Sequence, residues 1–223
     1  MRFWFSIVSA AVLAVAVMNG CNSGKISNSG EKMRIVCFGD SLTACGGPGG
    51  RYSDWLVQML PDCEIINRGI GGDTLGGGRK RFAKDVMELC PDILVFELGA
   101  NDYWRRKRSL DDLKKDYEYM IKTAHDAGIK IVIAGCFGAD YDPKRKIDTA
   151  RSGLPLEDYA CGIAAMEFEF ARRYGCVYIP VMQVDIEPNG IAPYWSDNNH
   201  PNKKGNELVA KRIKAAIDKV RNK

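Results

Sequence analysis

Short apolar runs alternate with amphipathic stretches along this chain from about residue 33 to its end. Five runs have the length and composition of buried β-strands, at residues 35–38, 64–67, 93–98, 131–134 and 177–181. The third run is apolar enough for a strand covered on both faces, as strands of parallel sheets usually are.

Between and after these runs, apolar residues recur at the three- and four-residue spacing that predicts helices. The stripes cover residues 52–60, 82–89, 110–124, 159–170 and 208–220. Pro61 and Pro91 close the first two, and Gly128 and Gly175 lie where the next two end. Residues 138–156 and 182–199 are long, mostly polar connections.

This alternation predicts one α/β domain over residues 33–223, a three-layer α/β/α sandwich around a five-stranded parallel sheet. In such a sheet, every loop that follows a strand lies at the same edge, where active sites form. Ser41, Gly72, Asn101 and His200 all lie in or beyond such loops. We therefore expect these four residues to meet.

The first strand leads directly into Gly39-Asp-Ser41, which places a serine hydroxyl at that edge. A serine is a poor nucleophile until a base takes its proton, and imidazole is suited to that task at neutral pH. The chain contains two histidines, His125 and His200. His200 follows Asp197 by three residues, so the carboxylate can fold back onto the ring, whereas His125 is expected to be a charge near a helix C-terminus.

Four segments resemble, in order, the signature blocks of the SGNH (GDSL) hydrolases: Gly39-Asp-Ser-Leu42, Gly69-Ile-Gly-Gly-Asp-Thr74, Gly99-Ala-Asn-Asp102 and Asp197-Asn-Asn-His200. The resemblance covers the chain from about Met33 and is nearest the bacterial thioesterase and lysophospholipase-like esterases. It implies a flavodoxin-like fold, no cofactor, no metal and hydrolysis of carboxylic esters. It also implies that Ser41 is the nucleophile, His200 the base and Asp197 its partner.

An attacked ester carbonyl becomes an oxyanion, which needs preorganised N–H donors. The candidates are the backbone N–H of Ser41, the backbone N–H of Gly72 and the side-chain amide of Asn101. The family block points to Gly72 as the glycine before Asp73, and Gly71 remains an alternative. Asp40 and Asp102 flank the site, where we expect them to fix the loops by accepting backbone N–H bonds.

The substrate is open at this stage. A small acyl ester or a lipid fits a lysophospholipase-, thioesterase- or arylesterase-like enzyme, whereas an acetylated glycan such as xylan or pectin fits a carbohydrate acetylesterase. The aromatic residues near the site could line an acyl groove or stack on sugar: Tyr103, Trp104, Tyr194 and Trp195. A non-catalytic surface binding module is a further alternative, against which the intact set of site residues argues.

The first twenty residues are predicted to be a signal peptide. Arg2 precedes a mostly apolar stretch over residues 3–18, shorter than the ~20 residues that span a membrane. Residues 17–21 resemble a bacterial lipobox, which implies that Cys21 is diacylated and begins the mature chain; residues 21–32 then predict a flexible tether. We expect an exported envelope lipoprotein, facing the periplasm or the cell surface, or a secreted protein if Cys21 is not lipidated.

The charge and the cysteine content argue against two further kinds of site, a nucleic-acid interface and a zinc site. The net charge of +4 is too small to indicate a nucleic-acid partner, and the basic run Arg105-Arg-Lys-Arg108 is typical of a solvated face, although it could meet an anionic substrate or lipid head group. No pair among the eight cysteines has Cys-x-x-Cys spacing, so a zinc site is not expected.

Overall fold

The computed structural model describes residues 31–183 and 193–222, except for the side chain of residue 139. The predicted signal peptide and Cys21 lie outside these residues, as does the first part of the predicted tether. Within the described residues, every helix is too short or too polar to span a bilayer.

Five parallel strands form the central sheet. They are β1 (Met33–Gly39), β2 (Cys63–Gly69), β3 (Ile93–Glu97), β4 (Lys130–Ala134) and β5 (Val177–Ile179), in the spatial order β2-β1-β3-β4-β5. The order reverses direction between β1 and β3, and open α/β sheets bind their ligands in the crevice at such a switch point. The predicted parallel sheet is therefore confirmed.

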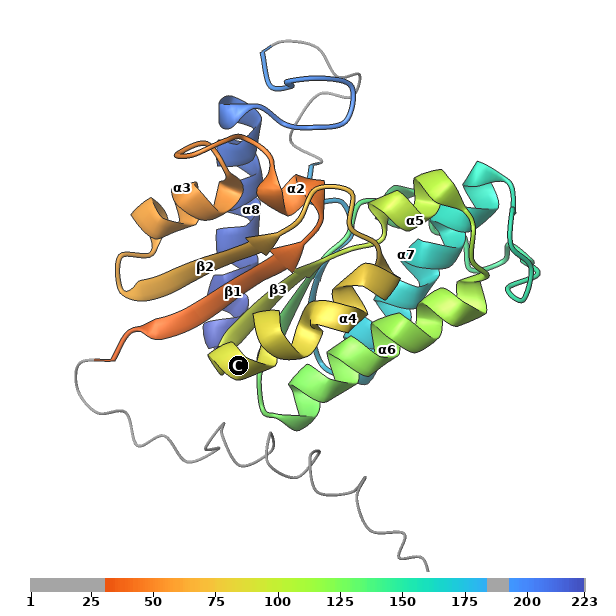
Figure 1. The fold of residues 1–223 in the computed structure, drawn as a ribbon, viewed down its shortest axis with the longest axis horizontal. Coiled ribbons are helices and arrows are strands. Elements are labelled where there is room, and N and C mark those ends of the chain that lie inside the picture. The colour runs from red at the N-terminus through yellow and green to blue at the C-terminus, as the bar shows by residue number, and fades with distance from the viewer. Residues whose placement is uncertain (1–30, 184–192, 223) are drawn as a thin grey trace, which may run out of the picture.

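Helices cover both faces of the sheet, as Figure 1 shows. One face carries α3 (Tyr52–Met59) and α8 (Lys203–Arg221), and the other carries α4 (Leu75–Asp85), α6 (Leu110–Asp126) and α7 (Leu156–Arg173). Alternate strand residues point to opposite faces, so Val36 and Phe38 pack toward α4 and α6, whereas Ile35 and Cys37 pack toward α3 and α8. Two apolar cores result, one in each interlayer space.

The helix after β2 differs from the sequence prediction. It begins at Leu75, before the predicted stripe, and its first turns contain three consecutive glycines. Thr74 caps it by accepting the Gly77 N–H at 3.2 Å, and a Cβ on Gly78 would lie 2.4 Å from Leu98 Cδ1, so a larger residue there would displace the Leu98 side chain. The α-helix ends at Asp85, and a separate 3₁₀ turn, Met87–Leu89, follows.

Three short helical segments were not predicted because they are too short for an apolar period. They are α2 (Ser41–Ala44), α5 (Ala100–Arg105) and the 3₁₀ turn Gly138–Asp140. Both α2 and α5 lie at the carboxyl ends of strands, and both begin within the signature blocks.

Candidate active site

The chain leaves β1 through a tight turn that presents Ser41 at the edge of the sheet. Asp40 caps α2, and its carboxylate accepts the Leu42 N–H at 3.0 Å. The Cys45 N–H donates to the Ser41 carbonyl at 2.7 Å, which closes the single turn of α2. The expectation that Asp40 accepts a backbone N–H is confirmed.

Ser41, His200 and Asp197 form one hydrogen-bonded line. His200 Nε2 lies 3.0 Å from Ser41 Oγ, although the two residues are 159 positions apart in the sequence. On the other side of the ring, His200 Nδ1 lies 2.8 Å and 3.0 Å from the two carboxylate oxygens of Asp197. When Nδ1 carries the ring proton and donates it to Asp197 in a hydrogen bond, Nε2 is unprotonated. Nε2 can then accept the proton of the Ser41 hydroxyl.

Asp197 is held in place by its own loop. Its Oδ1 accepts the backbone N–H groups of Asn199 at 2.7 Å and of His200 at 2.9 Å. The pKa of Asp197 is lowered, most by the hydrogen bond from the Asn199 N–H and next by the hydrogen bond from the His200 ring. The carboxylate therefore stays charged beside the imidazole.

The segment that carries His200 is closed on itself by a short bridge and leads directly into α8. Trp195 and Pro201 form an antiparallel bridge, and the Ser196 N–H donates to the His200 carbonyl at 2.8 Å. Asn202 caps α8 by accepting the Lys204 and Gly205 N–H groups. His200 therefore lies inside a bridged loop whose next residues begin a capped helix.

Asn206, which was not predicted from the sequence, connects two segments of the site. They are the turn around Ser41, residues 39–45, here called the serine turn, and the residues around His200, 193–202, here called the histidine segment. It is fully buried on α8, and its Nδ2 lies within hydrogen-bond distance of the Cys45 carbonyl, 3.2 Å, and the Pro201 carbonyl, 3.3 Å. One carbonyl follows the Ser41 helix and the other follows His200. An asparagine at an apolar position of a helix stripe is the one sequence signal that could have indicated this role.

Asn101 lies beside the nucleophile turn. Gly99, with φ of +134°, turns the chain from β3 into α5, and Asn101 Nδ2 then donates to Asp40 Oδ2 at 3.0 Å. An amide nitrogen carries two hydrogens, so this bond leaves one of them available for an oxyanion. Asp102, the next residue, accepts the Leu75 N–H at 2.8 Å, as expected of a loop-fixing carboxylate.

The two candidate glycines of the loop after β2 differ in backbone conformation. Gly72 has φ of +76°, a left-handed conformation that a side chain would strain. Gly71 lies in open space and needs no such conformation. Arg105 Nη2 donates to the Gly72 carbonyl at 2.8 Å, so α5 holds this loop.

Arg81, also missed from the sequence, ties the glycine loop to the nucleophile turn. Its Nε donates to Asp73 Oδ2 at 2.7 Å, and its Nη2 donates to the Gly39 carbonyl at 2.9 Å. The guanidinium also lies over the Phe38 ring, 4.1 Å from its centroid. In the sequence this arginine belongs to the basic run Arg79-Lys-Arg81 of α4, which is typical of a surface charge cluster.

A buried acid underlies the nucleophile turn. Glu97, 1% exposed at the end of β3, accepts the Asp40 N–H at 3.1 Å and the Thr43 hydroxyl at 3.0 Å. Burial and then the neighbouring Asp40 charge raise the pKa of Glu97 well above its usual value, and burial raises the pKa of Asp40 to about 6. A glutamate inside an otherwise apolar strand was the signal for this residue.

The remaining expectations concern the basic run and the aromatic residues. Arg105, Arg106 and Arg108 all donate to protein groups, to Gly72, to Leu154 and to Asp116 respectively. Trp104 is exposed, and the partly buried Tyr103 contacts the Trp104 ring edge-on and the Phe137 ring in a tilted arrangement. In residues 31–183 and 193–222, three or more His, Cys, Asp or Glu side chains nowhere gather as a metal ion would need.

The fold and the site define a three-layer α/β protein with a serine–histidine–aspartate triad at the switch point of its parallel sheet. The chain belongs to the GDSL-like lipase/acylhydrolase family, whose model matches residues 37–208. The family resemblance seen in the sequence is thereby confirmed.

Individual relatives agree with this placement. The chain is 30% identical over 109 residues to an acetylxylan esterase of Geobacillus stearothermophilus, 32% over 117 residues to an arylesterase of Vibrio mimicus, and 31% over 117 residues to the uncharacterized lipoprotein YqeF of Bacillus subtilis. These matches cover 41%, 48% and 46% of this chain and 48%, 55% and 47% of the relatives, so the chain matches about half the length of each.

Among solved structures, the crystal structure of TesA has the same fold. It superposes with a TM-score of 0.68 and 20% sequence identity, over 84% of this chain and 99% of TesA. At this identity the likeness concerns the fold alone, and it agrees with the flavodoxin-like sandwich expected from the sequence.

Proposed function

We propose that this protein is a serine hydrolase of carboxylic esters that works through an acyl-enzyme. The observation that carries the proposal is the line from Asp197 through His200 to Ser41, in which both imidazole nitrogens lie within 3.0 Å of their partners. Membership of the family and similarity to proteins named esterases support it.

In the acylation step, Ser41 Oγ attacks the ester carbonyl carbon while His200 Nε2 takes the hydroxyl proton. Asp197 stabilises the resulting imidazolium and keeps the ring oriented. The tetrahedral intermediate then expels the alcohol, which receives its proton from His200, and the acyl group remains on Ser41. In the second step, His200 takes a proton from water as the water oxygen attacks the acyl carbon. The bond between Ser41 Oγ and the acyl carbon then breaks, Ser41 Oγ takes the proton back from His200, and the acid leaves.

The negative charge of each tetrahedral intermediate develops on the former carbonyl oxygen. We assign its stabilisation to the Ser41 N–H, the Gly72 N–H and the free hydrogen of Asn101 Nδ2. Such donors contribute ~3 kcal/mol each when they are preorganised. The bonds from Asn101 to Asp40 and from Arg105 to Gly72 are the preorganising contacts.

Two substrate classes are compatible with this chemistry. Exposed Ile70, in the loop after β2, and exposed Trp104, on the helix α5 that follows β3, offer apolar surface to an acyl or aryl group. An acetylated carbohydrate is the second candidate, and the similarity to an acetylxylan esterase favours it. A series of p-nitrophenyl esters from acetate to palmitate, followed by acetylated xylan and a lysophospholipid, separates the two.

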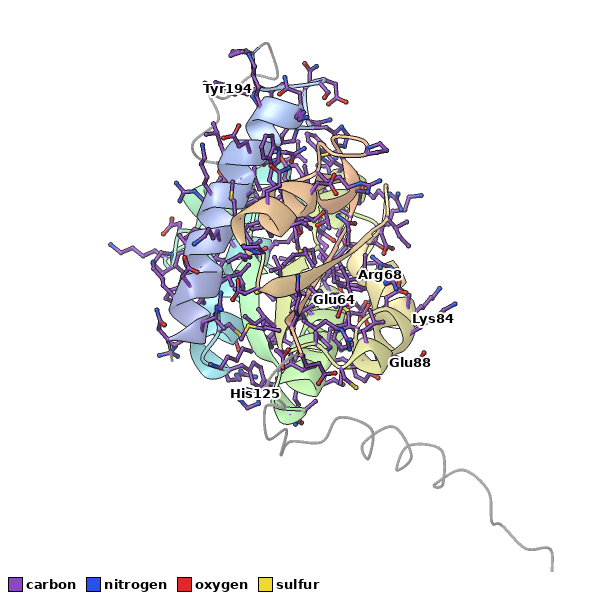
Figure 2. The ribbon with its side chains drawn as sticks, turned by 90° about the vertical axis from the view of Figure 1, so that its left-hand side faces the viewer. Glu64, Arg68, Lys84, Glu88, His125 and Tyr194 are labelled. Carbon is purple, nitrogen blue, oxygen red and sulfur yellow. The ribbon has the colours of Figure 1, made fainter. Side chains whose placement is uncertain are left out.

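Replacing the nucleophile tests the proposal directly. We expect Ser41→Ala to lower kcat by ~10⁴-fold or more without loss of folding, and to abolish labelling by a fluorophosphonate. His200→Asn should do the same, with His125→Asn as its matched control, because His125 lies at the opposite end of the molecule from Tyr194 of the histidine segment (Figure 2). Comparable turnover by Ser41→Ala contradicts the assignment.

We further propose that the protein is exported and anchored by a diacylated Cys21, with membrane contact through that lipid only. The lipobox-like residues 17–21 and the similarity to a protein named a lipoprotein support this. Cys21→Ala should move the protein from the membrane fraction to the soluble fraction of the producing bacterium, and Ser23→Ala should not. Wild-type protein that already fractionates as soluble contradicts the anchor.

A further inference from the structure

A groove with a volume of about 720 Å³ lies between α4 and α6. Its lining contains no aliphatic side chain, which makes it a poor site for an acyl chain and a suitable one for a hydrated, polar ligand. The lining residues are Thr74, Gly76, Gly77, Arg79, Lys80, Arg108, Asp116 and Tyr119.

Positive charge predominates in this groove, with three cations and one carboxylate. Asp116 is 6% exposed, and its carboxylate accepts hydrogen bonds from Arg79 Nη1 at 2.6 Å and from Arg108 Nη1 at 2.5 Å. Each guanidinium has five N–H donors, so these bonds orient the two arginines without using up their donors. The net charge of the whole chain is only +4, so this local surplus is not a consequence of a generally basic surface.

Lys80 is the cation of the groove that is least engaged by the protein. It is exposed on α4, and within the described part of the chain it has no acidic partner. Glycine at position 76 helps to shape the wall, since a Cβ there would lie 2.9 Å from Arg108 Nη1. The groove therefore offers one unengaged ammonium and two fixed guanidinium groups.

The groove begins where the proposed oxyanion loop ends. Thr74 and Gly76 follow Gly72 by two and four residues, and Leu75 is bound through its N–H to Asp102, the neighbour of Asn101. Arg105, one turn after Asn101 on α5, donates to the Gly72 carbonyl, and Arg108 follows it into the groove. Arg105, which holds the proposed oxyanion loop, and Arg108, which lines the groove, are thus three residues apart in the chain.

We propose that this groove binds the negatively charged part of the ester substrate, and that the substrate is the acetyl ester of an acidic oligosaccharide. The inference rests on the proposed ester hydrolysis and adds the substrate class to it. Carboxylates of sugar acids are recognised by guanidinium and ammonium groups in a water-exposed, polar groove. The oligosaccharide extends from the acetylated sugar at Ser41 toward Arg79, Lys80 and Arg108.

The test compares two forms of one substrate. Acetylated oligogalacturonides with free carboxylates are compared with the same oligosaccharides after conversion of their carboxylates to amides, and acetate release gives kcat and KM. We expect wild type to have a kcat/KM at least about fivefold higher for the free acid. This preference should shrink as NaCl is raised, since exposed charges are screened.

Lys80→Gln should lower kcat/KM for the free acid by about three- to tenfold, through KM, and leave the amidated oligosaccharide and p-nitrophenyl acetate unchanged. Lys84→Gln is the matched control, because Lys84 lies one turn further along α4, outside the groove lining, and is exposed (Figure 2). Titration calorimetry of tetragalacturonate against wild type and Lys80→Gln should show the same weakening without any chemical step.

The outcomes separate the two proposals. The groove proposal is wrong if the protein hydrolyses p-nitrophenyl acetate but has the same kcat/KM for the acid and amidated oligosaccharides. It is also wrong if Lys80→Gln lowers both values equally. Either result leaves the proposal of ester hydrolysis intact. If the protein prefers lysophosphatidylglycerol to the oligogalacturonides, and this preference depends on Lys80, the groove binds a lipid head group. The proposal of an oligosaccharide substrate is then wrong. A protein that hydrolyses no ester overturns the proposed function itself.

Discussion

At the residue scale, Asn101 illustrates how one side chain can serve both structure and chemistry. Its Nδ2 donates to Asp40, the residue that caps the nucleophile helix, and one hydrogen of the same nitrogen remains available. The Asp40 carboxylate is nearly surrounded by protein, with Leu42, Asn101 and Glu97 as its neighbours. An amide is suited to this place because it donates without adding another charge to a pair of buried acids.

We predict that Asn101→Ala lowers kcat by ~10²–10³ with little change in KM, since an oxyanion donor acts on the intermediate more than on the ground state. Steady-state kinetics on p-nitrophenyl acetate give both constants, and a thermal melt checks that the variant is folded. If only KM changes, Asn101 is not an oxyanion donor and its role is confined to Asp40.

At the element scale, the site depends on the relative position of two segments that are far apart in the chain. The serine turn follows β1, and the histidine segment precedes α8. Neither segment is part of the sheet, so strand pairing alone does not set the distance between Ser41 and His200. Asn206 supplies a direct connection, because its amide reaches the Cys45 carbonyl and the Pro201 carbonyl at once.

We predict that Asn206→Ala lowers kcat about tenfold or more, because a small displacement of the general base is costly for proton transfer. It should also cost ~1–3 kcal/mol of stability, since two carbonyls lose a buried donor. Asn222→Ala, at the far end of the same helix, is the matched control. Loss of stability with unchanged kcat in the folded fraction contradicts a positioning role.

At the scale of the whole molecule, the protein buries several acids whose charged forms are disfavoured. Burial raises the pKa of Glu167 to about 8, and it raises the pKa of Asp102 and of Asp40 to about 6. Glu167 is 2% exposed and accepts the Tyr178 hydroxyl at 3.0 Å. The folded chain therefore binds these protons more tightly than the unfolded chain does.

The sign of the pH dependence follows from this difference. Between an unfolded pKa of about 4–4.5 and the folded values, the folded state holds protons that the unfolded state has lost, so stability falls as pH rises. We predict that the free energy of unfolding by urea decreases from pH 5 to pH 8, by up to ~1.4 kcal/mol per pH unit for each such group. Exposed acids with lowered pKa values, such as Asp197, act in the opposite direction below about pH 4.

Glu167→Gln isolates one of these groups, because the amide oxygen can still accept the Tyr178 hydroxyl. The variant should lose part of the decline in stability between pH 5 and pH 8, whereas Glu88→Gln, which changes an exposed glutamate (Figure 2), should not. A wild-type stability that is flat or rising across this interval contradicts the buried neutral acid.

The sequence alone determined the strands, the longer helices and the edge at which the site residues gather. Apolar periodicity specifies buried strands and helix stripes, and parallel connectivity then brings every post-strand loop to one edge, so Ser41, Gly72, Asn101 and His200 could be expected together. The four ordered blocks also indicated the family. Helices as short as α2 and α5 were missed because a single turn has no period to detect, and α4 was misplaced because its glycines conceal its start.

Only the tertiary structure decided what holds the site together. Glu97, Arg81 and Asn206 each bond to a group that lies between 42 and 161 residues away. A polar residue at an apolar strand or helix position can indicate a buried role, as for Glu97 and Asn206, but no local pattern identifies the distant partner. The same holds for the cationic groove, because Arg79 and Arg108 become neighbours only when α4 and α6 pack side by side around Asp116. Hydrophobic patterning is local and is visible in sequence, whereas hydrogen-bond and charge complementarity exists only between surfaces that folding has brought into contact.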